Sequence, residues 1–155
     1  MPITTPTETP LRPTSRVVFA DSSGLIAQFR EADPDHLRAD AELRKLYREG
    51  KRLLTTNYVF DEVVTRVRRL NGFLDAHRVG EWILSSTAIR REYVDEAREA
   101  QAWRWYLKYH DQDFSFTDVT SMTVMRAYGL NEVFTFDSDF AKAGFTTLPR
   151  RDRAR

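Results

Sequence analysis

Short apolar runs rich in β-branched residues alternate along this chain with longer segments whose apolar residues recur at helical spacing. The apolar runs predict five strands, at residues 16–20, 53–55, 87–94, 132–136 and 145–148. The helical spacing predicts seven helices, at residues 22–30, 34–49, 57–71, 73–85, 95–109, 117–129 and 139–143. Strands that alternate with helices are typical of a parallel sheet. The chain is therefore predicted to be an α/β protein of three layers, with helices on both faces of a short central sheet.

Several helix boundaries carry their own signals. Asp33 is the expected N-cap of a helix with Pro34 in its first turn, and Gly50 is expected to end that helix. Thr56 or Asn57 can cap the following helix. These predicted helix boundaries rest on local sequence alone.

Length and composition predict one globular domain. The chain has 155 residues, of which 41% are hydrophobic and 30% are charged. We expect residues 16–149 to form the domain, residues 1–15 to be a disordered leader rich in Thr and Pro, and residues 150–155 to be a basic tail. No apolar run approaches the roughly 20 residues that span a bilayer, so a cytoplasmic protein without membrane association is expected.

Residue usage narrows the possible chemistry. The chain has no cysteine, which excludes disulfides, thiolate metal sites and cysteine nucleophiles. Its three histidines, His36, His77 and His110, are scattered without the spacing of zinc ligands. The net charge is only +1, but gathering several acidic residues in one site would leave the remaining surface basic. Such a surface suits a phosphate-rich substrate.

Acidic residues stand where a parallel sheet places its ligands, at the carboxyl ends of predicted strands. Asp21 follows the first strand, and Asp137 follows the strand predicted at 132–136. Each aspartate could instead serve as a turn or N-cap residue. Asp118 opens a helix and shares its apolar side with Met122 and Met125, so its carboxylate is expected to face inward. A favourable interaction with the helix dipole would explain an aspartate at this helix start, but not its inward direction.

A fourth acidic position is ambiguous. Asp61 and Glu62 flank the apolar face of their helix about equally, and both could simply be solvated. Carboxylates that converge repel one another unless a cation is present, and oxygen ligands suit Mg²⁺ or Mn²⁺. A metal site of this kind points to phosphodiester hydrolysis.

Taken in order, four segments of the chain resemble the PIN-domain ribonucleases, and among them the toxins of VapBC toxin–antitoxin modules. The segments are Val17–Ala27, Thr55–Glu62, Phe114–Ser121 and Phe134–Phe140, followed by Ala143–Phe145. The resemblance implies a PIN-like fold that spans about residues 16–148.

The resemblance also implies the site residues. Asp21, Glu62, Asp118 and Asp137 would form the catalytic acidic cluster, with Asp21 and Asp118 as metal ligands. Neighbouring hydroxyl groups would orient these acids, namely those of Ser22 or Ser23, Thr117 and Thr135. Asp139 could be an outer acid, but we interpret it as the N-cap of the next helical turn.

The implied activity is a Mg²⁺- or Mn²⁺-dependent endoribonuclease that is silenced by a cognate antitoxin and forms a homodimer. A PIN nuclease of RNA processing and a non-catalytic PIN-like RNA-binding module remain alternatives. A phosphatase of the haloacid dehalogenase type is disfavoured, because Ser23 stands where that family has a second aspartate. Candidate RNA contacts are Arg66, Arg68, Arg69, Arg90, Arg91, Arg104 and Lys108, while Trp103, Trp105 and Phe114 are assigned to the core or a dimer interface.

Overall fold

The computed structural model describes residues 16–151, which form a sheet of five parallel strands between two groups of helices. The strands lie side by side in the order β3-β2-β1-β4-β5. Their bounds are β1 Val17–Ala20, β2 Arg52–Thr56, β3 Ile89–Glu92, β4 Glu132–Phe134 and β5 Thr146–Leu148. The predicted α/β class and three-layer arrangement are confirmed.

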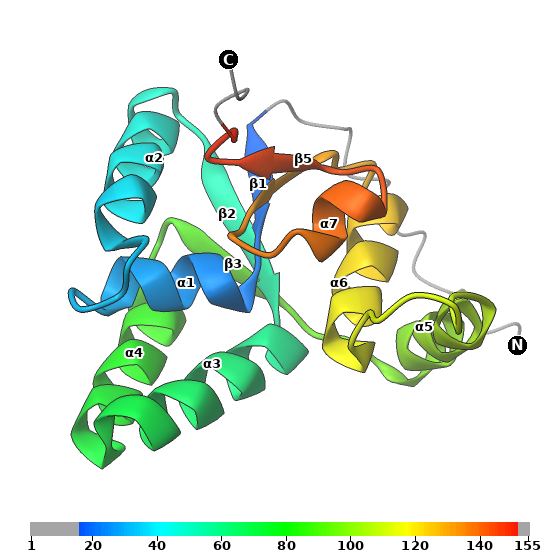
Figure 1. The fold of residues 1–155 in the computed structure, drawn as a ribbon. Coiled ribbons are helices and arrows are strands. Elements are labelled where there is room, and N and C mark those ends of the chain that lie inside the picture. Colours follow the sequence, from blue (N-terminus) through cyan, green and yellow to red (C-terminus); the bar gives the residue numbers. More distant parts are fainter. Residues whose placement is uncertain (1–15, 152–155) are drawn as a thin grey trace, which may run out of the picture.

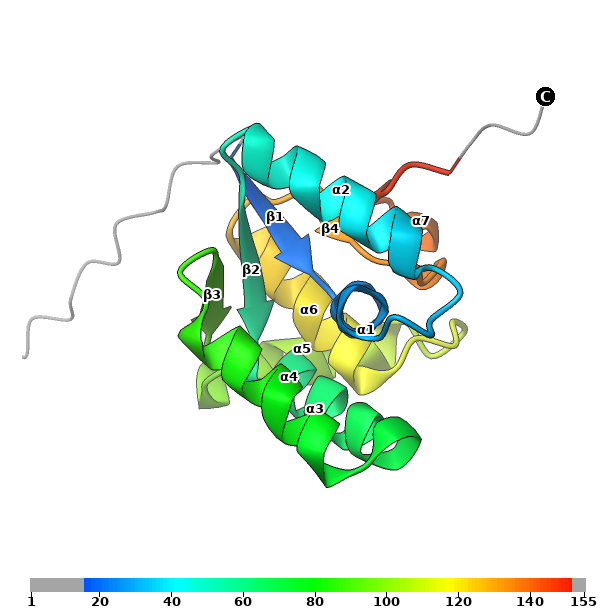
Figure 2. The same ribbon diagram turned by 90° about the vertical axis from the view of Figure 1, so that its left-hand side faces the viewer.

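Seven helices cover the sheet (Figures 1 and 2). In Figure 1 the first four helices lie to the left of the sheet and the last three lie to its right. Their bounds are α1 Ser22–Phe29, α2 His36–Arg48, α3 Asn57–Asn71, α4 Phe73–Ser85, α5 Glu96–Lys108, α6 Phe116–Ala127 and α7 Asp139–Lys142. Within residues 16–151, no helix combines the length and the apolar character needed to cross a bilayer.

The central strand β1 anchors the hydrophobic core. Val18, Phe19 and Ala20 are completely buried, because helices cover both faces of the sheet at this strand. Strand β2 pairs with one edge of β1, and β4 pairs with the other edge. The order in which the chain adds strands to the sheet therefore reverses between β1 and β4. Such a switch point opens a crevice at the carboxyl ends of the strands, where ligands bind in parallel sheets.

Three helix starts differ from prediction by one or two residues, and one of them is α5, which begins at Glu96 rather than at residue 95. Helix α2 begins at His36 with Asp35 as N-cap, so the expected N-cap Asp33 was wrong. The Asp33 carboxylate instead accepts the backbone N–H of Asp35 at 2.9 Å, which stabilises a turn before the helix. Helix α6 begins at Phe116, one residue earlier than predicted, because the Ser115 side chain caps it.

Every strand differs from its predicted range at one end or both, and the largest differences are in β3 and β4. Strand β3 begins only at Ile89, and β4 ends at Phe134 rather than at residue 136. Asp137 therefore does not follow its strand directly, whereas Asp21 does. The segment between Phe134 and Asp137 is reshaped by side-chain hydrogen bonds that belong to the site.

Gly24 allows α1 to lie against the end of β4. A Cβ atom at residue 24 would lie 2.6 Å from the backbone oxygen of Phe134, and a backbone atom cannot move aside as the end of a flexible side chain can. We expect Gly24→Ala to lower the free energy of unfolding by roughly 1–3 kcal/mol through overpacking. Chemical denaturation followed by circular dichroism measures this change.

Gly80 provides a matched control in the interior of α4. A Cβ atom there would meet Val64 and Phe60 at 3.6 and 3.7 Å, which is ordinary van der Waals contact. Gly80→Ala should therefore leave stability unchanged or raise it by up to ~1 kcal/mol, because alanine favours the helix. Equal effects of the two substitutions would contradict the role assigned to Gly24.

Candidate metal-dependent active site

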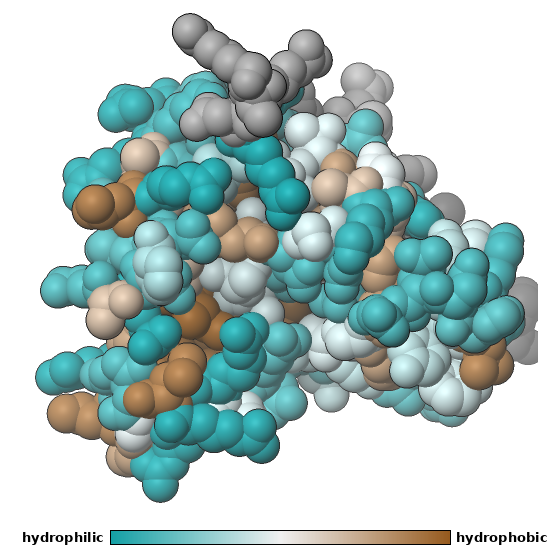
Figure 3. Space-filling model, viewed as in Figure 1, coloured by the Kyte–Doolittle hydropathy of each residue, from teal (hydrophilic) through white to brown (hydrophobic). Residues whose placement is uncertain are grey.

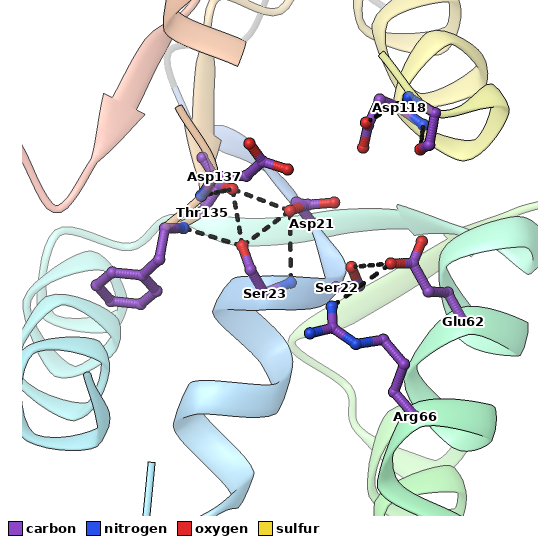
Figure 4. Close-up of polar contacts among 10 residues, drawn as sticks. Asp21, Ser22, Ser23, Glu62, Arg66, Asp118, Thr135 and Asp137 are labelled. Carbon is purple, nitrogen blue, oxygen red and sulfur yellow. Dashed lines mark hydrogen bonds and ion pairs between the residues drawn. The ribbon is translucent and has the colours of Figure 1, made fainter. Parts of the chain in front are cut away.

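The predicted carboxylates are carried to the switch point by four separate elements (Figure 4). Asp21 ends β1, Glu62 lies on α3, Asp118 lies in the first turn of α6, and Asp137 lies between β4 and α7. The packing of α3 and α6 around the sheet brings residues together that are far apart in the sequence.

Asp21 is held in one orientation by its neighbours. It is 2% exposed and caps α1, and its Oδ2 accepts hydrogen bonds of 2.9 Å from the hydroxyl groups of Ser23 and Thr135. Its other oxygen, Oδ1, is buried and accepts no hydrogen bond from any residue in 16–151. Burial raises the pKa of Asp21, although the bonds from Ser23 and Thr135 oppose this rise. The carboxylate is therefore fixed on one side and unsatisfied on the other.

The same two hydroxyl groups shape the segment that carries Asp137. The Ser23 hydroxyl accepts the N–H of Phe136 at 2.9 Å, and the Thr135 hydroxyl accepts the N–H of Asp137 at 3.0 Å. These bonds turn the backbone away from the ladder of β4, which explains why the strand ends early. They also tie the position of Asp137 to that of Asp21.

Asp118 faces inward as its spacing predicted. It is 8% exposed, and Met122 and Met125 of the same helix are buried. The carboxylate also accepts the backbone N–H of Ser115 at 2.9 Å, while the Ser115 hydroxyl accepts the N–H of Asp118 at 3.0 Å. This capping box is a role that the sequence reasoning missed, although a serine three residues before an acid is its usual signal.

The environment of Asp118 disfavours its charged form. Burial raises the pKa of Asp118 to about 6, and the negative charges of Asp21 and Asp137 act in the same direction. The hydrogen bonds from Ser115 lower this pKa but do not restore its usual value. Without a cation, the site therefore carries electrostatic strain at neutral pH.

The structure distinguishes Glu62 from Asp61, which the helical spacing could not do. The Ser22 hydroxyl donates to Glu62 Oε1 at 2.9 Å, and an Arg66 guanidinium nitrogen lies 3.6 Å from the same oxygen. Asp61 is exposed and lines a different surface pocket, which also contains Tyr93. Of the two adjacent acids on α3, Glu62 is therefore the one that lies in the site (Figure 4).

Asp139 has a larger part in the site than the sequence suggested. One carboxylate oxygen from each of Asp118, Asp137 and Asp139 lies within 4.8 Å of the other two. The prediction that Asp139 is an N-cap was wrong, because Ser138 occupies that position. The Asp139 N–H donates to Asp137 Oδ1 at 2.9 Å, and its own carboxylate accepts from Lys142.

Of the predicted hydroxyl groups, three contact an acid of the site. Ser22 reaches Glu62, while Ser23 and Thr135 reach Asp21. In the described part of the chain, the Thr117 hydroxyl makes no hydrogen bond to these acids, and only its backbone oxygen is engaged, by Thr120. Predicting these contacts required the packing of α1 against β4, which lies beyond local sequence.

A divalent cation fits this donor set. The unpartnered Oδ1 of Asp21, the three clustered carboxylates and the raised pKa of Asp118 all indicate uncompensated negative charge. Carboxylate oxygens are the ligands preferred by Mg²⁺ and Mn²⁺. Asp21 lies outside the trio of Asp118, Asp137 and Asp139, so its pairing with Asp118 on a metal stays a prediction.

Comparisons with known proteins agree with this arrangement. The sequence profile of the PIN domain matches residues 18–146. The 23S rRNA-specific endonuclease VapC20 of Mycobacterium tuberculosis is 33% identical over 132 residues, which cover 85% of this chain and 98% of that protein.

Solved structures with the same fold are found as well. The crystal structure of M. tuberculosis VapC20, a sarcin–ricin loop cleaving toxin, superposes with a TM-score of 0.74 at 32% identity, over 83% of this chain and 95% of that one. VapBC2 from Rickettsia felis bound to a promoter DNA fragment has a TM-score of 0.62 at 11% identity, over 83% and 93%. FitAcB from Neisseria gonorrhoeae has a TM-score of 0.60 at 21% identity, over 84% and 95%. The last two show a shared fold alone.

The raised pKa of Asp118 predicts a pH dependence of stability. Because the folded pKa of about 6 exceeds the ordinary value of 3.8, Asp118 favours folding most below pH 4, and this contribution is lost as pH rises through 6. In metal-free buffer, Asp118→Asn should be more stable than the wild type at pH 7.5 by roughly 1–2 kcal/mol, a value reduced for solvent screening. The difference should vanish near pH 4. Denaturant melts at both pH values measure it.

The same experiment with Mg²⁺ or Mn²⁺ provides the control. The cation should stabilise the wild type at pH 7.5 but not Asp118→Asn, because it binds the native carboxylates. The asparagine side chain still offers an oxygen that accepts the Ser115 N–H. The variant therefore keeps this capping hydrogen bond, and the comparison measures the effect of the lost charge. A wild-type-to-variant difference that stays constant from pH 4 to 7.5 would contradict the account.

Proposed function

The chain belongs to the PIN-domain family, in the branch of the VapC toxins, and from this premise we propose that it hydrolyses RNA phosphodiester bonds as a metal-dependent endoribonuclease. We also propose that it is the toxin of a type II toxin–antitoxin pair and acts in the cytoplasm. Its cofactor would be Mg²⁺ or Mn²⁺. One observation carries the enzymatic proposal: Asp118, Asp137 and Asp139 bring carboxylate oxygens within 4.8 Å of one another, and the buried Oδ1 of Asp21 is satisfied by no residue of 16–151.

The residues of this chain have separable roles in the proposed reaction. Asp118 and Asp137 would hold the cation together with the free oxygen of Asp21. A bound divalent cation lowers the pKa of water and offsets the charge that develops on the phosphate. Ser23 and Thr135 fix the direction of Asp21, since both donate to its Oδ2.

Glu62 is suited to receive a proton from the attacking water. Within residues 16–151, the hydrogen bond from Ser22 and the ion pair with Arg66 both involve Oε1, so Oε2 stays available to accept a hydrogen bond. Arg66 limits the negative charge at this side of the site and can contact a substrate phosphate. The Asp139 carboxylate accepts from Lys142, and the Asp139 backbone N–H donates to the Asp137 carboxylate.

We propose 23S ribosomal RNA as the substrate, because the M. tuberculosis relative that spans nearly the whole domain is specific for it. The predicted RNA contacts other than Arg66 are all exposed on the surface and stay predictions. They are Arg68, Arg69, Arg90, Arg91, Arg104 and Lys108.

A cognate antitoxin is the proposed partner. Apolar side chains gather over α3 and α4 on the face shown in Figure 3, where Leu70, Phe73 and Leu74 are more than half exposed. The patch begins on α3, the helix that also carries Glu62, and such a surface suits a partner segment that combines apolar residues with a basic side chain. A homodimer is proposed through α5, where Trp103 and Leu107 are half exposed; the other predicted aromatics, Trp105 and Phe114, pack with the core.

Substitution of the acids tests the nuclease proposal. Asp21→Asn, Asp118→Asn and Glu62→Gln should each reduce Mg²⁺-dependent cleavage of 23S rRNA at least roughly a hundredfold, since each removes a charged group of the reaction site. Asp61→Asn is the matched control, because Asp61 neighbours Glu62 but is exposed away from the site. Cleavage is measured by primer extension on purified ribosomes.

The control must retain activity near that of the wild type, and circular dichroism must show each variant folded. Undiminished cleavage by folded Asp118→Asn would refute the proposal. A protein that binds 23S rRNA but leaves it intact in Mg²⁺ and in Mn²⁺ would instead support the non-catalytic alternative.

A further inference from the structure

A second, smaller pocket adjoins the acidic site on the side of α2 and β5. Its volume is about 90 Å³. Thr135 and Asp137 border it, so it shares a wall with the acidic site. The other lining residues come from the start of α2 and from the chain around β5, namely Asp35, Arg38, Phe136, Thr147, Pro149 and Arg151. We call this the α2–β5 pocket.

Arg38 is held in place at this pocket. Its guanidinium carbon lies 5.4 Å from the centre of the Phe136 ring, and Nη1 donates to Asp35 at 3.1 Å. Stacking over an aromatic ring orients the planar group while leaving its edge accessible. Within residues 16–151, this side chain donates a hydrogen bond only to Asp35, so most of its five N–H donors stay available.

The size of the pocket decides which part of a substrate it can take. A pocket of about 90 Å³ has room for several water molecules. That space suits a phosphate group, whereas pockets for whole drug-sized ligands begin at roughly 300 Å³. A phosphate group is therefore the part of the RNA that we assign to this pocket.

The charges of the pocket point to the same ligand. Arg38 and Arg151 supply two cations, and Thr147 supplies a hydroxyl group. Of the two acids, Asp35 is paired with Arg38, and Asp137 belongs to the proposed metal site. Arginine with a nearby hydroxyl is a common arrangement for binding phosphate.

We propose that the α2–β5 pocket binds a backbone phosphate of the RNA next to the one that is hydrolysed. This inference rests on the proposed ribonuclease function. Arg38 lies over Phe136, whose neighbours in the chain, Thr135 and Asp137, belong to the acidic site. A phosphate held by Arg38 therefore fixes the RNA strand beside that site. The pocket thus positions the scissile bond, and Arg38 is a positioning residue.

Binding of RNA to an inactive variant tests the proposal. In the Asp118→Asn background, Arg38→Ala should weaken binding of a labelled sarcin–ricin stem-loop RNA roughly tenfold, since a charge-assisted hydrogen bond is lost. The slope of log affinity against log salt should also fall, by roughly 0.7–0.9, as expected when one phosphate contact disappears. Fluorescence anisotropy at several salt concentrations measures both quantities.

Arg44→Ala is the matched control. Arg44 lies on the same helix and pairs with Asp40 at 2.7 Å, as Arg38 pairs with Asp35, but it is remote from the pocket. It should bind the RNA as the parent protein does, with the parent salt slope. Equal affinities and slopes for Arg38→Ala and Arg44→Ala would overturn the proposal.

A third substitution acts in the opposite direction. Asp35→Asn removes a negative charge from the pocket, and the Asp35 side chain makes no capping hydrogen bond to α2 that would be lost. We expect RNA binding to tighten several-fold, and weakened binding would contradict the assignment. Inorganic phosphate at millimolar concentration should compete with RNA for the parent protein but less for Arg38→Ala; equal competition would mean that the pocket does not hold the phosphate.

Cleavage assays separate this inference from the function on which it rests. In the active protein, Arg38→Ala should raise KM for 23S rRNA with a smaller change in kcat, and Arg38→Lys should restore part of the affinity. If wild-type protein cuts no RNA, the proposed function fails whatever Arg38 does. If wild type cuts RNA and Arg38→Ala matches it in KM, only the pocket assignment fails.

Discussion

Repulsion among buried carboxylates is the constraint on which this structure depends. Asp118 is nearly buried, and its pKa rises to about 6 because burial and the charges of Asp21 and Asp137 disfavour ionisation. A fold that gathers acids in this way loses stability unless a cation compensates them. The same charges suit a divalent cation, the group that we propose for chemistry on phosphate at this site.

The fold supports this cluster through a few hydroxyl groups and one glycine. Gly24 lets α1 approach the last residue of β4 closely enough for Ser23 to reach both Asp21 and the backbone of Phe136. Thr135 completes the connection by binding Asp21 and the N–H of Asp137. Asp21 and Asp137 are therefore positioned as one unit, and Thr135 and Asp137 of this unit also border the α2–β5 pocket.

Local sequence predicted the parts of the site that depend on periodicity and on strand ends. The alternation of apolar runs and helical segments predicted the parallel sheet, and helical spacing predicted that Asp118 faces inward. Spacing could not separate Glu62 from Asp61, because the difference is a hydrogen bond from Ser22 on another helix. Asp139 was misassigned for a similar reason, since its place depends on how the segment after β4 bends.

The central claim is that the acidic site exists to bind a divalent cation. Its most direct test is a crystal structure of the protein with Mn²⁺, with anomalous scattering used to locate the ion. The account predicts an anomalous peak in contact with Asp118 and Asp137, and no peak there in crystals of Asp118→Asn. An active protein whose crystals bind Mn²⁺ elsewhere and leave this cluster without an ion would contradict it.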